Sequence, residues 1–549
     1  MKNSILRIIL SLLPAVLFSG CGLLDSKEDL HLTDEMLKTR YYHLTSWGYR
    51  AYNYIPNGFD RIDGNLFATV SDEAQYVTTL SSAARFNDGS WNQYSNPDDC
   101  WDYFYRGIHD VNYFIENTPD YAEDLALNRD TITISGKQQY EAEVLDVFRL
   151  RREAIVLRAY YYFELLKRYG GVPVMNSTDS DPYGPRADYD DIVSMIVDDI
   201  DSAAPDLVES WREENLGNKD GRVTLGVAKA LKSRILLYAA RPLHNPSGDT
   251  GKWEKAAAAA DEVIRMGRWS LAPSYRGLFL TASVNTNPEV IWARRDSENN
   301  KMETANYPIA TNGGKTGVCP SYNLVMAYER LSGSDPSDLS ASIDPRYNAT
   351  IVGNLDEWTG RKLQIYLGGT DDPSNPNSSV TGFYLKKFLN DNLNLTIGET
   401  EIHSWIIFRY AEILLNYAEA MNELYGPDGK GEYGMSAREA VNMVRSREDV
   451  GMPGVSAVSK EEMRDAIKHE RRIELAFEEH RFWDLLHWKD AEKVLNEPIT
   501  GAVWTEGSRK AAVKEVAGRK FDASKMYLYP IPQTEIVRTG HAIEQNPNW

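Results

Sequence analysis

The chain has 549 residues and a formal net charge of −20, with 42% hydrophobic and 26% charged residues. A chain of this length can bury a large core and normally divides into more than one part, and the composition is that of a globular protein. So acidic a surface repels nucleic acid, and no basic stripe offsets it. Nucleic-acid binding is therefore excluded from the expected functions.

The first twenty residues have the three zones of a secretory signal peptide. Lys2 and Arg7 form a basic start, and the apolar run that follows is too short for a membrane span of ~20 residues. Small residues then precede Cys21 in "FSGC", which is similar to the lipobox of bacterial lipoproteins, although Phe18 stands where Leu is commoner. We predict a signal peptide over 1–20 and a lipidated Cys21, the alternative being an ordinary signal peptide.

A lipidated Cys21 would anchor the protein permanently, because several acyl chains hold a membrane stably where one does not. Residues 21–32 then form a flexible tether, and the "KED" within them is similar to a signal for the outer face of the outer membrane. Loss of Lys2 and Arg7 takes the charge of the mature chain from −20 to −22. Only Cys100 and Cys319 remain, and the sequence leaves open one disulfide or two free buried thiols.

Long amphipathic helices dominate the mature chain, with apolar residues at three- and four-residue spacing. Gly170-Gly171 end the first long helix and Pro173 prevents its resumption, whereas Thr224 caps a later one that stops at Pro242. Antiparallel pairs of such helices, repeated at intervals of about 34–45 residues, indicate a tetratricopeptide-like arrangement. The predicted helices are 143–171, 191–207, 224–242, 253–267, 408–426 and 436–448.

Residues 270–400 break this rhythm, because they are rich in Gly, Asn, Pro and Ser, which favour turns and loops. A long irregular insertion in a helical protein usually carries recognition.

Five stretches in this order, behind the lipobox cysteine, resemble the SusD/RagB family of outer-membrane nutrient-binding lipoproteins. They are "LRAYYYFELLKRYGGVPV" (157–174), "NPEVIWARR" (287–295), "FRYAEILLNYAEAMNE" (408–423), "AIKHERRIELAFEEHRFWDLLHWK" (466–489) and "YLYPIPQTEI…QNPNW" (527–549). The resemblance spans nearly the whole mature chain.

The resemblance implies an all-α fold: a tetratricopeptide-like helical-hairpin scaffold with a large irregular, loop-rich ligand-binding lobe. We expect an N-terminal helical region over 33–269 and a C-terminal region over 270–549 that includes the lobe at 270–400. The resemblance also implies a partner, a SusC-like TonB-dependent transporter, over which the protein sits as an extracellular lid held by its lipid at the outer membrane.

No catalytic, metal or cofactor motif is complete. "HERRIE" (469–474) lacks the second His that a zinc protease motif needs, since position 473 is Ile. We expect Glu470, Arg471, Arg472 and Glu474 to form ion pairs along the helix, while Ile473, Ala476 and Phe477 pack inward. "NGGKT" lacks the first glycine of a phosphate loop, and no nucleophile elbow or zinc-site spacing occurs. A catalytic pair of carboxylates, as in a glycosidase, remains an open alternative, because 80 Asp and Glu residues always offer pairs whose separation the sequence does not show.

A sugar site needs an exposed aromatic ring for the C–H face and amide or charged groups for the hydroxyls. Two turn-rich stretches have this composition. The candidate ligand-binding residues are Arg85, Asn87, Asp88, Trp91, Asn92 and Tyr94 in the first, and Tyr307, Asn312 and Tyr322 in the second. The aromatic residues expected to be scaffold are Trp101, Tyr105, Trp292, Tyr410, Tyr417, Trp483 and Trp488.

We therefore expect a protein without a cofactor that binds oligosaccharide and delivers it to the transporter without cleaving it. Two alternatives remain: capture of oligopeptide, which the same residue types could bind, and a surface glycoside hydrolase of helical fold.

Overall fold

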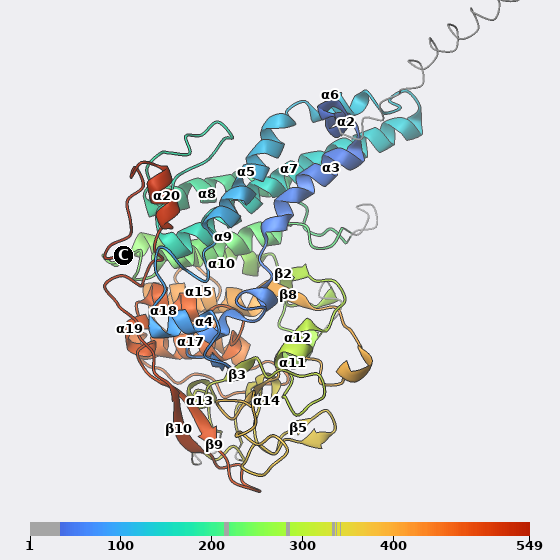
Figure 1. Ribbon diagram of the computed structural model, residues 1–549. Helices are drawn as coiled ribbons and strands as arrows, with labels where there is room; N and C mark the ends of the chain where they lie inside the picture. Colours follow the sequence, from blue (N-terminus) through green and yellow to red (C-terminus); the bar gives the residue numbers. More distant parts are fainter. Residues whose placement is uncertain (1–32, 213–218, 281–285, 332–334, 336, 341) are drawn as a thin grey trace, which may run out of the picture. The chain divides into compact units, whose positions relative to one another are not determined.

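The computed structural model describes residues 33–212, 219–280, 286–331, 335, 337–340 and 342–549 (Figure 1). The predicted signal peptide, the tether and Cys21 lie outside the described residues. The chain divides into two compact units, a smaller one with described residues 33–48 and 118–148, and a larger one of 49–117 and 149–549. No helix of the described residues is both long and apolar enough to cross a membrane.

The smaller unit is helical. It contains α2 (Asp34–Thr39), most of α3 (Tyr41–Tyr49), α6 (Tyr121–Ala126) and the first part of α7 (Ile134–Tyr169). The Tyr41 hydroxyl donates to Asp146 of α7 at 2.5 Å, and Arg129 pairs with Glu143 of the same helix. These contacts join the short helices to the start of α7.

The larger unit is mostly helical, which confirms the predicted fold class. Its longer helices are the rest of α7, α5 (Trp101–Asn117), α8 (Tyr189–Ala203), α9 (Leu225–Ala240), α10 (Thr250–Arg265), α15 (Tyr410–Tyr425), α16 (Ala437–Arg445), α17 (Lys460–Glu474) and α18 (Arg481–Trp488). Short ones are α4 (Ala83–Asp88), α11 (Tyr275–Leu280), α12 (Lys301–Asn306), α13 (Tyr322–Val325), α14 (Arg346–Thr350), α19 (Ala491–Val494) and α20 (Gln533–Arg538).

The helix ends lie close to the predicted positions. Gly170 has a left-handed φ of 72° directly after α7, a conformation that costs glycine little. The Thr224 side chain accepts from the backbone N–H of Val227 at 3.3 Å and so caps α9. Ser436 and Glu439 form a capping box at the start of α16.

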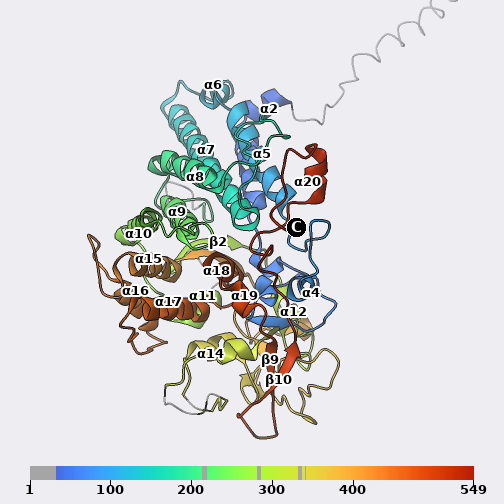
Figure 2. The same ribbon diagram turned by 90° about the vertical axis from the view of Figure 1, so that its left-hand side faces the viewer.

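The predicted helix pairs are present. Arg158 of α7 donates to Asp199 of α8 at 2.8 Å, α9 packs on α10, and α15 packs on α16. In Figures 1 and 2, α8, α9, α10 and α15 follow one another through the larger unit, and α14 and the β9–β10 hairpin lie toward its far end. Regular helix packing therefore gives way to an irregular lobe, as the composition of 270–400 indicates.

Strands in the described residues form five two-stranded antiparallel sheets. The pairs are β1 (Ala74–Tyr76) with β3 (Val318–Pro320), β2 (Val290–Arg295) with β8 (Ser404–Arg409), β4 (Ile351–Val352) with β7 (Tyr384–Leu385), β5 (Glu357–Trp358) with β6 (Arg361–Lys362), and β9 (Ile499–Val503) with β10 (Ala512–Ala517). Such short ladders leave most of the lobe's position to side-chain contacts.

A buried ion cluster at the end of α17 supplies many of these contacts. The Glu474 carboxylate accepts from Arg409 and Arg447 at 2.7 Å and from Arg346 at 2.9 Å. Arg409 also donates to Glu478 at 2.6 Å and to Glu289 at 2.8 Å. Burial alone would raise the pKa of Glu474, but Arg447, Arg409 and Arg346 hold it below its usual range.

This cluster corrects the expectation for "HERRIE". Glu470 pairs with Arg346 and Arg445, Arg471 with Asp484, and Arg472 with Asp72, so the partners lie on other elements rather than along the helix. The predicted inward packing of Ile473, Ala476 and Phe477 is confirmed, because all three are buried.

Cys100 and Cys319 are free and buried. Of the two alternatives left open by the sequence, one disulfide or two free buried thiols, the structure has the two free thiols. Burial raises the pKa of Cys100 to about 12 and that of Cys319 to about 11, which keeps both protonated at neutral pH.

A buried carboxyl group beside β1 also joins distant parts of the larger unit. Glu73 accepts from the backbone N–H of Phe477 at 3.0 Å and from the Ser71 hydroxyl at 3.3 Å. Burial raises the pKa of Glu73 to about 7, and the neighbouring Asp72 adds to this shift.

We expect Glu474→Gln to lower the free energy of unfolding by about 3–5 kcal/mol, because a neutral amide replaces the buried carboxylate that three buried arginines share, and each arginine loses one of its ionised partners. Denaturant unfolding of the mature chain measures the change. Lys430→Gln is the matched control, since its pair with Glu439 is solvent-exposed and should contribute less than about 1 kcal/mol. Equal effects of the two variants would contradict a structural role for the cluster.

Glu73→Gln should change how stability depends on pH. The folded pKa of about 7 lies above the usual value near 4.5. The favourable contribution of protonated Glu73 is therefore complete below about pH 4.5 and lost as the pH rises through about 7. The difference in free energy of unfolding between Glu73→Gln and the wild type should therefore shift in favour of the variant by about 2–4 kcal/mol between pH 4.5 and pH 8. Unfolding at both pH values measures this. A pH-independent difference, or the same gain in the exposed Glu497→Gln control, would refute it.

Candidate functional site

The structure separates the candidate residues of the first stretch. Trp91 is only 2% exposed, and its ring packs against Phe86, Tyr529 and Trp549 with centroids 4.7–5.0 Å apart. No face of the indole is left for a sugar, so the expectation of an exposed platform at Trp91 does not fit this structure. Trp91 is a core residue.

The other residues of this stretch surround a tight turn. Arg85 donates to the Ser95 hydroxyl, the buried Asn87 amide donates to the Thr69 carbonyl at 3.1 Å, and Asp88 accepts from Ser90 at 2.8 Å. Asn92 accepts from the N–H of Tyr94 at 3.0 Å. Tyr94 alone is a free platform, with 77% of its surface exposed.

The second stretch is divided as well. Tyr322 is buried and stacks on Phe383 with centroids 6.0 Å apart. Tyr307 is also buried, but it lines a pocket together with the exposed Asn312. Two of the nine predicted ligand-binding residues therefore meet at one concave site, and the others lie outside its lining.

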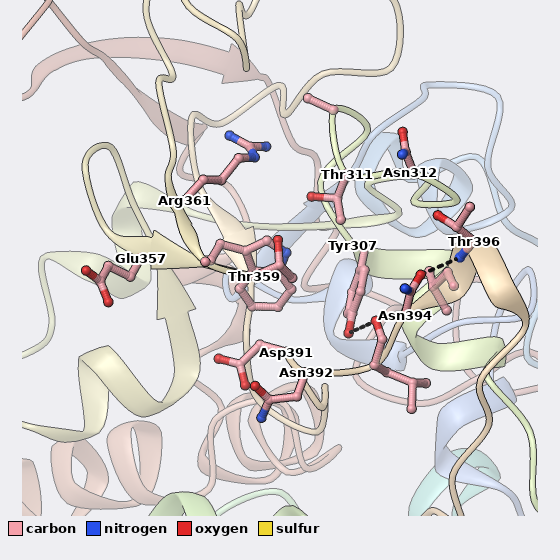
Figure 3. A pocket seen from close by; sticks show the side chains of 15 residues that line it. Tyr307, Thr311, Asn312, Glu357, Thr359, Arg361, Asp391, Asn392, Asn394 and Thr396 are labelled. Carbon is pink, nitrogen blue, oxygen red and sulfur yellow. Dashed lines mark hydrogen bonds between the residues drawn. The ribbon is translucent and has the colours of Figure 1, made fainter.

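This pocket has a volume of about 740 Å³ and lies in the irregular lobe (Figure 3). Small-molecule sites have volumes of about 300–1,000 Å³, so it is large enough for an oligomeric ligand. Its polar lining consists of Thr311, Asn312, Glu357, Thr359, Arg361, Asp391, Asn392, Asn394 and Thr396. Tyr307 and Trp358 supply its aromatic rings. In Figure 3 the Tyr307 ring lies between Thr359 and Asn394.

One wall is the β5–β6 hairpin. Trp358 pairs with Arg361, so the turn has two residues, Thr359 and Gly360, with φ values of 48° and 77°. Positive φ at both positions is the geometry of a type I′ turn, which glycine tolerates and a β-branched residue rarely adopts. Buried Asp371 accepts from both terminal nitrogens of Arg361 at 2.6 and 2.7 Å and holds this wall in place.

A second wall is the turn over residues 390–396. The Tyr307 hydroxyl donates to the carbonyl of Asn390 and, at 3.3 Å, to that of Leu393. The Asn394 side chain accepts from the N–H of Thr396 at 3.0 Å. Tyr307 therefore acts as an anchor for this turn rather than as a platform.

The third wall is the loop over 307–316, closed by a hydrogen bond from the Thr316 N–H to the Tyr307 carbonyl at 2.9 Å. Gly314 permits the closure, because a Cβ there would lie 2.5 Å from the same carbonyl oxygen. The "NGGKT" sequence thus belongs to a tight surface loop that presents Asn312 to the pocket.

The lining is suited to hydrogen bonding with a neutral polar ligand. Asparagine amides donate and accept, and threonine hydroxyls do both, so hydroxyl groups of a ligand can find partners in either sense. Charges are largely matched: Arg361 pairs with Asp371, and Asp391 with Arg276 at 3.2 Å. The buried indole N–H of Trp358 and hydroxyl of Thr311 have no hydrogen-bond partner among the described residues, which leaves each able to bind water or ligand.

The described residues contain no group of three or more His, Cys, Asp and Glu side chains able to hold a metal ion. Glu357 and Asp391 are the carboxylates of the pocket lining.

Sequence reasoning missed the hairpin and the turn over 390–396. The hairpin has little local signal, because Glu357, Arg361 and Lys362 are not strand formers and only Gly360 favours a tight turn. Three asparagines within "NDNLN" do indicate a turn with exposed amides. What the sequence does not contain is their approach to Asn312.

Comparisons with known proteins agree across the chain. A family model described as "SusD family" matches residues 288–549, and one described as "Starch-binding associating with outer membrane" matches 24–237. The SusD-like protein P38 of Formosa agariphila is 26% identical over 494 residues, which cover 83% of this chain and 81% of that protein.

Solved structures share the fold. A SusD-like protein of Bacteroides fragilis aligns with a TM-score of 0.77 and 26% identity, covering 94% of this chain and 99% of its own. A SusD-like carbohydrate-binding protein of the same species aligns with a TM-score of 0.74 and 22% identity, covering 92% and 99%.

Proposed function

The chain belongs to the SusD-like family, and on that basis we propose that it is a surface protein that captures oligosaccharide for a SusC-like transporter. The observation that carries this proposal is the pocket of about 740 Å³ whose exposed lining consists mainly of amide and hydroxyl side chains. Three separate turns of the lobe supply that lining (Figure 3).

In this proposal the ligand is bound at its edges. Asn312 and Asn392 are exposed and reach the pocket from different turns, so each amide can bridge neighbouring hydroxyls of one sugar. Each such hydrogen bond contributes about 0.5–1.5 kcal/mol net, so a single residue of sugar binds weakly and longer oligomers bind better. The matched charges favour a neutral glycan over an anionic one, and the −22 charge of the mature chain acts in the same direction.

Peptide capture is the alternative, because amides also pair with a peptide backbone. The lining favours sugar over peptide in one respect. A peptide bound as an extended strand is recognised through an exposed sheet edge and pockets for alternate side chains, whereas the exposed lining of this pocket consists of polar side chains on turns.

The protein is proposed to bind without cleaving. The lining contains no His, Cys, Ser or Lys side chain, so a glycosidase would have to rely on Glu357 and Asp391. The Asp391 carboxylate is already engaged by Arg276 at 3.2 Å.

The location of the protein is proposed from the sequence and the family. A lipid on Cys21 holds the mature chain at the outer membrane, facing outward, and the tether over 21–32 extends at most about 40 Å. A protein that covers a transporter as a lid needs such a flexible tether, because the lid must move while the lipid stays in the membrane.

Asn312→Ala and Asn392→Ala should each weaken binding of the preferred oligosaccharide by about 3–10-fold, because each removes one or two hydrogen bonds to the ligand. A glycan array identifies the ligand, and calorimetry measures the variants. Asn117→Ala on the surface of α5 is the control and should bind like the wild type. If no oligosaccharide binds and a peptide mixture is retained, the cargo is peptide. New reducing ends after incubation with the ligand would make the protein a glycosidase.

Cys21→Ala should release the protein from the membrane fraction, since the anchor depends on acylation of that thiol. Fractionation of cells followed by detection of the protein tests this. Ser19→Thr is the control, because it keeps the thiol and a small side chain before it. Unchanged membrane association of Cys21→Ala would refute lipid anchoring.

A further inference from the structure

A second, smaller pocket lies in the larger unit, away from the lobe. It has a volume of about 230 Å³ and is lined by residues of the first turns of α5, the segment over 173–182 and the region of α20. Figure 2 shows where α5 and α20 lie. Trp101, Tyr105, Pro173, Met175 and Ile543 supply its apolar lining. The first two were expected to be scaffold only; the structure buries Trp101 and leaves Tyr105 partly accessible.

The walls of this pocket are held by hydrogen bonds that do not need a ligand. The Tyr105 hydroxyl donates to the Pro173 carbonyl at 2.7 Å, and the Asn112 amide donates to the Met175 carbonyl at 2.7 Å. Near the C-terminal segment, which contributes Ile543 to the lining, Arg186 donates to the Glu544 carbonyl at 3.0 Å. Because the walls are already ordered without a ligand, binding costs little conformational entropy of the protein.

The polar groups of the lining are mostly committed to the protein. The Tyr105 hydroxyl and the Asn112 amide bind backbone, and the Thr178 hydroxyl donates to Glu116. Since these groups are satisfied internally, affinity must come from the aromatic and aliphatic lining, where ring contacts add about 0.5–1.5 kcal/mol beyond area burial.

The charges at the pocket are paired. Glu535 pairs with Arg538, and Asp102 pairs with Arg106 along α5 at 3.5 Å. A net charge on a ligand would therefore meet no unpaired counter-ion among these four groups, which favours a neutral ligand. The buried Glu535 carboxylate nevertheless remains an acceptor, because its oxygens offer about four lone-pair sites.

We propose that this pocket is a separate binding site for a neutral phenolic ring, whose ring contacts Trp101 and Tyr105 and whose hydroxyl donates to Glu535. The volume of about 230 Å³ accommodates one substituted ring rather than a chain of sugars. The site is independent of the pocket in the lobe and does not rest on the glycan proposal. A free phenol and the tyrosine side chain of a peptide present the same chemistry.

Calorimetry of the mature chain with a matched series of ligands tests this proposal. 4-Ethylphenol should bind, and its methyl ether should bind at least fivefold more weakly because it cannot donate to Glu535. Tyramine and 3-(4-hydroxyphenyl)propionate, which add a positive or a negative charge, should also bind more weakly. N-acetyltyrosinamide distinguishes the sources: binding as tight as that of 4-ethylphenol indicates that a peptide tyrosine fits, and weaker binding indicates a free phenol.

Two variants locate the site. Tyr105→Ala should lower the affinity for both 4-ethylphenol and its ether by tenfold or more. Glu535→Gln should leave the affinity for the ether unchanged and reduce the affinity difference between the phenol and the ether. Asn312→Ala in the lobe is the control and should leave the affinities for all five ligands unchanged, with circular dichroism confirming that each variant is folded. No binding of 4-ethylphenol to the wild type, equal binding of phenol and ether, or binding that survives Tyr105→Ala would overturn the proposal.

Discussion

The carboxylate of Glu474, fully buried and shared by three arginines, is the interaction on which the rest of the larger unit depends. Arg409 ends β8, Arg346 begins α14 and Arg447 follows α16, so helical and irregular segments converge on the last residue of α17. Removing such charges from water costs several kcal/mol each, and only the near-complete hydrogen bonding of the cluster offsets that cost. The ion cluster therefore determines which segments come together, whereas the apolar core supplies most of the free energy of folding.

The cluster also explains how a lobe with so little regular structure keeps its position. Lys387, two residues after the end of β7, donates to Glu478 at 2.7 Å and to the carbonyl of Ala476 at 2.7 Å. Phe477 and Glu479, on either side of Glu478, have left-handed φ values of 66° and 65°, which bulky residues rarely adopt. That strained segment persists because Arg409, Lys387 and Glu73 all bind it, and it joins the helices to the strands that lead into the pocket.

The helices could be predicted because their determinants are local: apolar spacing, the cap at Thr224 and the stop at Gly170 all lie within a few residues of the boundary. Trp91 could not be placed in the same way. The local sequence around an aromatic residue in a turn-rich stretch does not show whether its ring faces solvent. Here the ring of Trp91 packs on Trp549, from the other end of the chain. The charges of "HERRIE" were predicted to pair, but the i,i+4 rule could not supply partners such as Asp72 and Arg346. Asn312 was found from composition, whereas Thr359 and Asn392 needed the tertiary structure.

The pocket of the lobe separates two kinds of residue, and this separation bears on how ligand choice is encoded. Tyr307 and Asp371 are buried and hold the turns by hydrogen bonds, so their replacement would disturb the shape of the pocket together with the fold. Asn312 and Asn392 are exposed on those turns. In the proposed function, their replacement would change hydrogen bonding to the ligand, while the buried hydrogen bonds would still hold the backbone. A scaffold fixed by buried ion pairs thus allows the side chains at the turn tips to vary without loss of stability. In the proposed binding function, a few exposed amides and hydroxyls of this pocket would decide which ligand binds. Fold and family can be recognised from the sequence, whereas the particular ligand cannot.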